Sequence, residues 1–135
     1  DYKDAIACSS RQIAQLVAWI QQQDFYANTT VIVTGDHLSM SAEMEKELGG
    51  YSHRRVYNCF LNAAAAPAKT QERVFTAMDM FPTTLAALGV QIEGDRLGIG
   101  TNLFGTRQTL AEELGFEPYE QEISRHSCFF DSLAY

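Results

Sequence analysis

The fold class is decided by the stretch Thr29-Thr30-Val31-Ile32-Val33-Thr34-Gly35-Asp36-His37-Leu38-Ser39. Its first six residues are all β-branched, which is typical of a β-strand. The run is apolar on both faces, and such strands lie in the centre of a sheet that helices cover on each side. We therefore expect a central strand over residues 30–34, followed by a sharp turn at Gly35.

The segment before this strand predicts a helix over residues 9–23. Ser9 and Gln12 have the spacing of a capping box, which favours a helix start at Ser9. The apolar residues that follow recur at helical spacing and form one stripe: Ile13, Leu16, Val17 and Ile20. Residues 24–28 are then the turn that connects this helix to the strand.

The rest of the chain continues to alternate between helical and strand patterns. We expect a short exposed helix within residues 40–50, a loop over 50–55, strands over 56–62 and 73–76, a helix capped by Asp79 and closed by Gly89, a Gly-rich loop over 94–105, a short helix over 109–114, and a polar tail from Pro118 onward. The pattern indicates a layered α/β fold. About three strands are few for a complete open sheet, so the chain has the character of one part of a larger domain.

Composition limits the classes of function. The 135 residues are 46% hydrophobic and 20% charged, as in a soluble globular domain. The net charge is −7, and Lys and Arg do not cluster, which excludes nucleic acid as an expected partner. No apolar run is long enough to span a bilayer, and no signal peptide is visible. Because the first residue is Asp1, we expect the chain to start inside a longer protein. An incomplete sheet would also expose an unpaired strand edge, and such an edge would favour self-association.

The three cysteines do not form a recognisable framework. Cys8, Cys59 and Cys128 are widely spaced and odd in number, so they match neither a zinc finger nor an evident set of disulfides. Cys59 is most simply a small core residue. A disulfide between Cys8 and Cys128 stays open as an alternative in an oxidising compartment.

Asp36 and His37 are the strongest candidates for chemistry. In open α/β sheets functional groups gather at the carboxyl ends of strands, where this pair lies. A carboxylate oxygen and a neutral imidazole nitrogen together suit zinc or manganese. The alternative is that Asp36 caps a turn and His37 is a surface residue. No spacing rule supports His53 or His126 as a third ligand.

Three other segments could carry a function. His53-Arg54-Arg55 could bind a phosphate, although a solvated basic loop that offsets the preceding acidic segment is the favoured interpretation. Asp79 is better explained as a helix N-cap than as a catalytic carboxylate. Gly98 and Gly100 lack the third Gly of a dinucleotide loop, and the chain has no P-loop. The acidic stretch over residues 112–122 is most simply a solvated surface.

The segment around Asp36 and His37 resembles the metal-binding segment of the alkaline phosphatase and sulfatase superfamily. It is most similar to the branch of phosphoglycerol transferases and lipoteichoic acid synthases. Three further segments agree in order: residues 20–29 before the strand, the Asp-capped helix over 79–89, and the Gly-rich segment over 97–104. Together these segments cover roughly residues 5–105.

The resemblance implies a three-layer α/β/α sandwich of the alkaline phosphatase type, of which only the C-terminal part is present. Residues 1–115 would belong to the catalytic domain, and 116–135 would form a C-terminal tail. In the family a divalent ion, here manganese or zinc, is held by an Asp-His pair, a Glu and a Thr nucleophile. Asp36 and His37 match the pair. The Thr and the Glu would lie upstream, so no catalytic nucleophile is expected in this chain.

The resemblance also implies a function for the parent protein. That protein would be a metal-dependent phosphoglycerol transferase or sulfatase-like phosphodiesterase, acting on phosphoglycerol or another phosphate or sulfate ester through a phospho-Thr intermediate. It would be membrane-anchored, with its catalytic domain on the periplasmic or extracellular face. The rest of the catalytic domain would be the partner, and the isolated chain would be inactive. Apart from the resemblance, the run of His53 and two Arg residues makes His53 a candidate substrate contact. The alternative from another class is a non-catalytic α/β domain that binds a ligand or partner.

Overall fold

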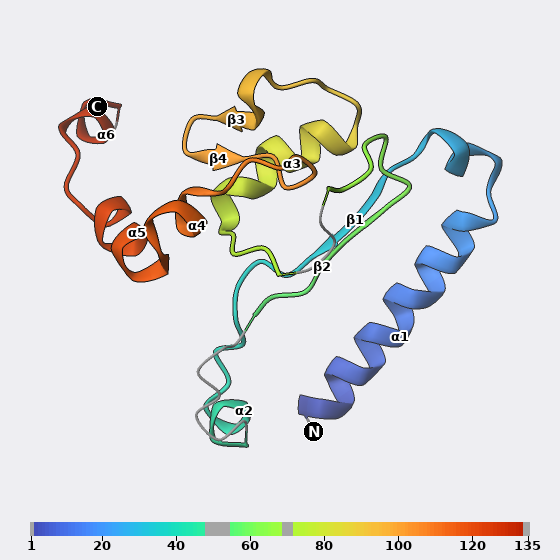
Figure 1. The fold of residues 1–135 in the computed structure, drawn as a ribbon. Helices are drawn as coiled ribbons and strands as arrows, with labels where there is room; N and C mark the ends of the chain where they lie inside the picture. The colour runs from blue at the N-terminus through green and yellow to red at the C-terminus, as the bar shows by residue number, and fades with distance from the viewer. Residues whose placement is uncertain (1, 48–54, 69–71, 134–135) are drawn as a thin grey trace. The chain divides into compact units, whose positions relative to one another are not determined.

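The structure is a computed structural model that describes residues 2–47, 55–68 and 72–133 (Figure 1). The chain forms two compact units, residues 1–63 and residues 64–135. Both units mix helices with short strands, so the α/β class predicted from the sequence is confirmed at this level.

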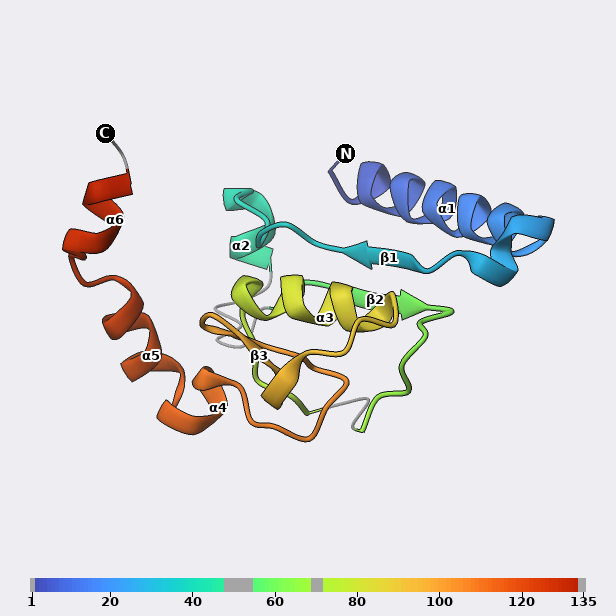
Figure 2. The same ribbon diagram turned by 90° about the horizontal axis from the view of Figure 1, so that it is seen from above.

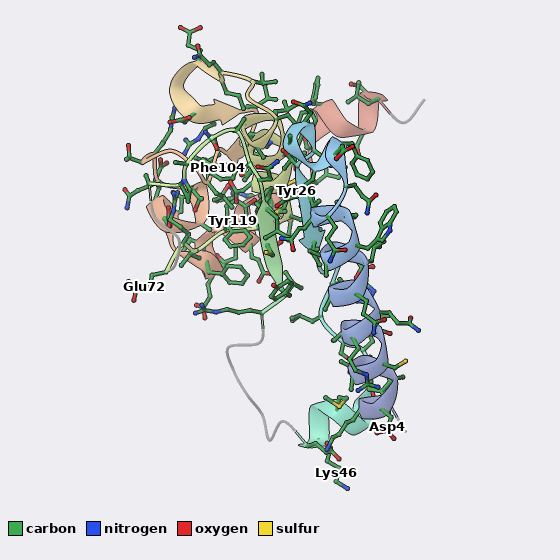
Figure 3. The ribbon with its side chains drawn as sticks, turned by 90° about the vertical axis from the view of Figure 1, so that its right-hand side faces the viewer. Asp4, Tyr26, Lys46, Glu72, Phe104 and Tyr119 are labelled. Atoms are coloured by element: carbon green, nitrogen blue, oxygen red, sulfur yellow. The ribbon has the colours of Figure 1, made fainter. Side chains whose placement is uncertain are left out.

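The first unit is a helix followed by a two-stranded sheet. Its elements are α1 (Tyr2–Gln21), η1 (Asp24–Asn28), β1 (Val31–Thr34), α2 (Ala42–Glu47) and β2 (Asn58–Leu61). The strands β1 and β2 run antiparallel, and their register pairs Val31 with Leu61 and Thr34 with Asn58. The amide of Asn62 donates to the carbonyl oxygens of Tyr26 (labelled in Figure 3) and Thr29, which ties the end of β2 to the turn before β1.

The helix α1 begins earlier than predicted. It starts at Tyr2, so Ser9 and Gln12 lie inside the helix and do not form its cap. Residues 2–8 contain neither Gly nor Pro, and Ile6 lies on the same stripe as Ile13, so nothing in this segment interrupts the helix. None of the residues of α1 is buried.

Two of the predicted strands and one short helix in the first half of the chain are confirmed. The strand over residues 30–34 appears as β1, the strand over 56–62 as β2, and the exposed helix within 40–50 as α2. Among residues 2–47, 55–68 and 72–133, however, β1 pairs with β2 alone, so the predicted central position of this strand is not seen there. The loop predicted over residues 50–55 lies, apart from Arg55, outside the described residues.

In its described residues, the second unit combines short helices with a small hairpin. Its elements are η2 (Ala77–Asp79), α3 (Met80–Ala87), η3 (Glu93–Asp95), β3 (Arg96–Leu97), β4 (Gly100–Thr101), α4 (Leu110–Leu114), α5 (Phe116–Ile123) and α6 (Cys128–Leu133). Strand β4 packs against α3 and η2, and Figure 1 shows the hairpin beside α3. Figure 2 shows α4, α5 and α6 following one another along the chain.

Two predictions for the second unit were wrong. No strand forms over residues 73–76, because the N–H of Val74 donates to the side chain of Glu112 and its carbonyl accepts from Thr109, so the backbone is paired without a ladder. The loop over residues 94–105 contains the hairpin of β3 and β4. The segment from Pro118 onward, for which the sequence predicts a polar tail, contains most of α5 and all of α6.

The helix predicted after Asp79 is present, but its cap lies elsewhere. Asp79 itself has helical φ and ψ and makes no N-cap hydrogen bond. The N-cap is Thr76, whose backbone N–H donates to Oδ2 of Asp79 at 2.8 Å, because a 3₁₀ turn extends the helix by one turn before Met80. The predicted helix over residues 109–114 is confirmed as α4, with Thr109 as its N-cap.

The core of the second unit is small and partly polar. Asp79 is 2% exposed, and its Oδ1 accepts from the backbone N–H of Thr101 at 2.7 Å. The hydroxyl of Thr83 donates to the carbonyl of Asp79 at 2.6 Å and accepts from the N–H of Leu103. Tyr119 (labelled in Figure 3) is also buried. These bonds join η2, α3 and the hairpin into one unit.

The cysteines are free thiols. Cys8 and Cys128 are exposed, and Cys59, expected in the core, is half-buried in β2. No helix in the described part of the chain is both long and apolar enough to span a membrane.

Candidate metal-binding site

The segment directly before β2 sets the place of the residues that follow β1. The N–H of Gly35 donates to the carbonyl of Tyr57 at 2.8 Å, which adds one backbone bond beyond the last strand pair. A Cβ at Gly35 would lie 3.1 Å from the Cβ of Val56, which is a tight contact. The backbone of Gly35 therefore lies close to residues 56 and 57, and the next two residues follow from this fixed point.

Asp36 and His37 are held by short-range hydrogen bonds. The N–H of His37 donates to Oδ1 of Asp36 at 2.9 Å. Nδ1 of His37 lies 2.8 Å from the carbonyl oxygen of Leu38. Because a carbonyl only accepts, Nδ1 carries the hydrogen, and Nε2 of the neutral imidazole is then the nitrogen with a lone pair.

The two remaining donor atoms face each other. Nε2 of His37 lies 3.6 Å from Oδ2 of Asp36. Two ligands about 2.1 Å from one ion are separated by about 3.4 Å at a tetrahedral angle, so the observed separation fits a shared divalent cation. The side chains are 88% exposed for Asp36 and 58% exposed for His37, which leaves both accessible.

The pair supplies two donors, and a complete site needs more. Within the described ranges no cluster of three or more His, Cys, Asp or Glu side chains is placed to hold a metal ion. His53, the predicted substrate contact, lies outside the described residues. His126 pairs with Asp131 at 2.7 Å in the second unit, so its imidazole already has a carboxylate partner.

The hydroxyl of Tyr57 adds no charge near this segment. Its side chain is 67% exposed, and a hydrogen bond with the Cys59 thiol raises its pKa above the ordinary value of 10.0. Tyr57 is therefore neutral at physiological pH.

Asn58, the next residue, accepts a hydrogen bond from the hydroxyl of Thr34 at 2.5 Å. The sequence offered no signal for this contact, because the contact depends on the register of β1 and β2.

Arg73 and Glu112 form a separate, mostly buried ion pair in the second unit. The guanidinium donates to both carboxylate oxygens of Glu112, at 2.8 and 3.0 Å, and to three carbonyl oxygens. Burial by itself raises the pKa of Glu112, but hydrogen bonds from Arg73 and from two backbone N–H groups, with the Arg73 charge, lower it below 4.5 overall. The solvated surface predicted for residues 112–122 is thus wrong at Glu112.

The Arg73 pair does not form an anion site. It borders a cavity of about 160 Å³ that is also lined by Ala68, Thr106 and Gln108. The guanidinium donors are already directed at Glu112 and at the carbonyls of Leu103, Gly105 and Arg107. The pair therefore joins the segment before α3 to α4, and the exposed Asp36–His37 pair remains the better candidate for chemistry.

Comparisons with a family model and with curated proteins point to the same family. The family model described as Sulfatase matches residues 1–90. Phosphoglycerol transferase I of Xanthomonas euvesicatoria pv. vesicatoria (strain 85-10) is 30% identical over 99 residues, which are 73% of this chain and 14% of that protein. Phosphoglycerol transferase I of Xanthomonas axonopodis pv. citri (strain 306) is 31% identical over 84 residues, which are 62% of this chain and 12% of that protein. No solved structure matches significantly.

The matched part of the chain contains the candidate site. Residues 1–90 include both strands of the first unit, the Asp36–His37 pair and the whole of α3. The chain spans 14% and 12% of the lengths of the two curated relatives, so it corresponds to a small part of either protein. This chain belongs to the sulfatase family of the alkaline phosphatase superfamily, in the phosphoglycerol transferase-like branch.

Proposed function

We propose that this chain is the C-terminal part of a three-layer α/β/α catalytic domain in a metal-dependent phosphoglycerol transferase or related sulfatase-like phosphodiesterase. Residues 1–115 belong to that domain, and residues 116–135 form its C-terminal tail. One observation carries the proposal. In a chain of this family, a carboxylate and an imidazole lie 3.6 Å apart just beyond the carboxyl end of β1.

In the proposed site, Asp36 and His37 are two ligands of a manganese or zinc ion. Oδ2 of Asp36 and Nε2 of His37 bind the ion, and the hydrogen bond from Nδ1 to Leu38 keeps the imidazole in the required tautomer. When bound, the ion would lower the pKa of a hydroxyl nucleophile and stabilise charge on the phosphoryl oxygens. The Thr nucleophile and a Glu ligand belong to other parts of the parent protein, and His53 contacts the substrate phosphate.

The partner in this proposal is the rest of the catalytic domain. The first unit leaves α1 without a buried residue, and in the second unit Phe81 and Leu88 of the α3 region are 63% and 60% exposed. Exposed apolar surface of this extent supports packing against further protein. The parent is membrane-anchored, with the site on the periplasmic or extracellular side, and acts on phosphoglycerol or another phosphate or sulfate ester. The isolated chain uses the same exposed surfaces to self-associate.

Metal-dependent thermal stability tests the proposal. Mn²⁺ or Zn²⁺ at about ten times its dissociation constant should stabilise the chain by about 1.4 kcal/mol, and Asp36→Ala and His37→Ala should remove this effect. His126→Ala is the matched control, because His126 also lies beside a carboxylate. Equal stabilisation of all four proteins would contradict the metal role and favour a non-catalytic binding domain.

A further inference from the structure

We propose that Asn58 is a positioning residue for the Asp36–His37 pair and acts through Thr34. The inference rests on the proposed metal role of the pair and adds a residue to it. Asn58 is the first residue of β2 and lies opposite Thr34, the last residue of β1. The ligand pair therefore begins two residues after this cross-strand position.

A side-chain hydrogen bond joins the two strand ends. The hydroxyl of Thr34 donates to Oδ1 of Asn58 at 2.5 Å, and its distance to the carbonyl of Gly35 is longer, at 3.2 Å. The Asn58 amide oxygen therefore holds the Thr34 side chain across the ladder. Because χ1 of Thr is stiff, fixing its hydroxyl also restricts the backbone at the end of β1.

Two further contacts tie the same point to the segment directly before β2. The N–H of Gly35 donates to the carbonyl of Tyr57, and a Cβ at Gly35 would lie in tight contact with Val56, at 3.1 Å. Beyond Gly35, the hydrogen bonds of Asp36 and His37 within the described residues link these two side chains to adjacent residues. These local bonds orient the two ligands relative to each other, and the contacts with residues 56–58 orient them relative to the sheet.

The downstream side of the pair has contacts of its own. The hydroxyls of Ser39 and Tyr2 lie 3.0 Å apart, and the N–H of Ser41 donates to the Ser39 hydroxyl at 3.3 Å. Tyr2 is the first residue of α1, and the ends of helices fray. The bond between Thr34 and Asn58 differs from these contacts because it lies within the strand pair, at the point where the chain leaves the sheet.

The chain offers matched variants for a test. Thr34→Val removes the hydroxyl with little change of shape, Thr34→Ser keeps a donor, and Asn58→Ala removes the acceptor. Thr30→Val is the control, because the hydroxyl of Thr30 donates to the carbonyl of Asn62 at 3.1 Å across the opposite end of the same strand pair. All four substitutions are made in the full 135-residue chain.

Backbone dynamics without metal give the first measurement. Thr34→Val and Asn58→Ala should lower the ¹⁵N heteronuclear NOE of Asp36 and His37 and speed amide exchange at Gly35, and Thr34→Ser and Thr30→Val should leave both near wild type. Unchanged dynamics in Thr34→Val and Asn58→Ala would overturn the inference. Equal loosening by Thr30→Val would also overturn it, because the effect would then be a general weakening of the strands.

Mn²⁺ binding gives the second measurement. Loss of a residue that orients a metal ligand typically weakens metal binding by at least about 10-fold, so we expect that loss in Thr34→Val and Asn58→Ala. Thr34→Ser and Thr30→Val should stay within about 2-fold of wild type by the same reasoning. Loosened dynamics with unchanged Mn²⁺ affinity would overturn the inference. If Asp36→Ala leaves binding unchanged, the proposed function fails, and the dynamics alone decide whether Asn58 orders this segment.

Discussion

At the scale of single residues, Arg73 shows how a polar side chain can stabilise the fold. Its side chain is 8% exposed, and its partner Glu112 is 15% exposed. Removing one member of a buried pair leaves the other charge without compensation, so Arg73→Ala should lower the free energy of unfolding by about 3 kcal/mol. Urea denaturation followed by circular dichroism measures the change.

The control for this prediction is an exposed pair. Arg125 and Glu122 are 72% and 58% exposed, and surface pairs contribute little. Arg125→Ala should change the free energy of unfolding by less than about 0.5 kcal/mol. Equal losses from the two substitutions would show that burial does not decide the contribution of Arg73.

The same pair predicts a dependence on pH. The folded chain lowers the pKa of Glu112 below its ordinary value of 4.5, so the carboxylate contributes stability above that value. The contribution is lost as the pH falls from about 4.5 through the lower pKa of the folded state. The stability difference between wild type and Glu112→Gln should therefore shrink over this range. A difference that stays constant between about pH 3 and pH 7 would contradict the assignment.

At the scale of elements, the hairpin of β3 and β4 depends on a glycine that packs against η2. A Cβ at Gly100 would overlap the carbonyl oxygen of Met78 and lie 2.8 Å from its carbonyl carbon. Gly100→Ala should therefore force the hairpin away from η2 and cost about 3 kcal/mol of unfolding free energy. Thermal or urea unfolding measures this loss.

Gly98 is the matched control in the same hairpin. Its φ is +61°, and a Cβ there would meet nothing within 4 Å. Gly98→Ala should cost about 1 kcal/mol, from the left-handed backbone alone. The packing explanation would be wrong if Gly98→Ala cost as much as Gly100→Ala.

Local sequence patterns predicted those helices and strands whose backbone conformation is decided by the residues of the segment itself. The β-branched run predicted β1, and the pattern over residues 109–114 predicted the helix that the structure shows as α4. The rules failed where a distant residue decides the backbone. Val74 is in no strand because Glu112 and Thr109 pair its backbone, and the cap of α3 moved to Thr76 because a 3₁₀ turn precedes the helix.

The candidate site was partly predictable for the same reason. Asp36 and His37 are adjacent in sequence and follow a strand, so the pattern identified them directly. Asn58 was missed because its relation to Thr34 exists only through the antiparallel register of β1 and β2. The tautomer of His37 also required the structure, since it depends on the position of the Leu38 carbonyl.

At the scale of the whole molecule, we expect the isolated chain to be catalytically silent. In the proposed function it supplies two metal ligands, and the nucleophile belongs to another part of the parent. With Mn²⁺ or Zn²⁺ present, the chain should not hydrolyse a chromogenic phosphodiester above the rate of the metal alone. Turnover that exceeds this background and is lost in Asp36→Ala would show that the chain contains a complete site.

The most direct test of the central claim is a Mn²⁺ titration followed by NMR of the imidazole protons. We expect that substoichiometric Mn²⁺ broadens the signals of His37, that Asp36→Ala abolishes this broadening, and that the signals of His126 stay sharp although His126 pairs with Asp131. If His126 broadens as much as His37, or if Asp36→Ala leaves His37 equally broadened, Asp36 and His37 are not a metal-binding pair.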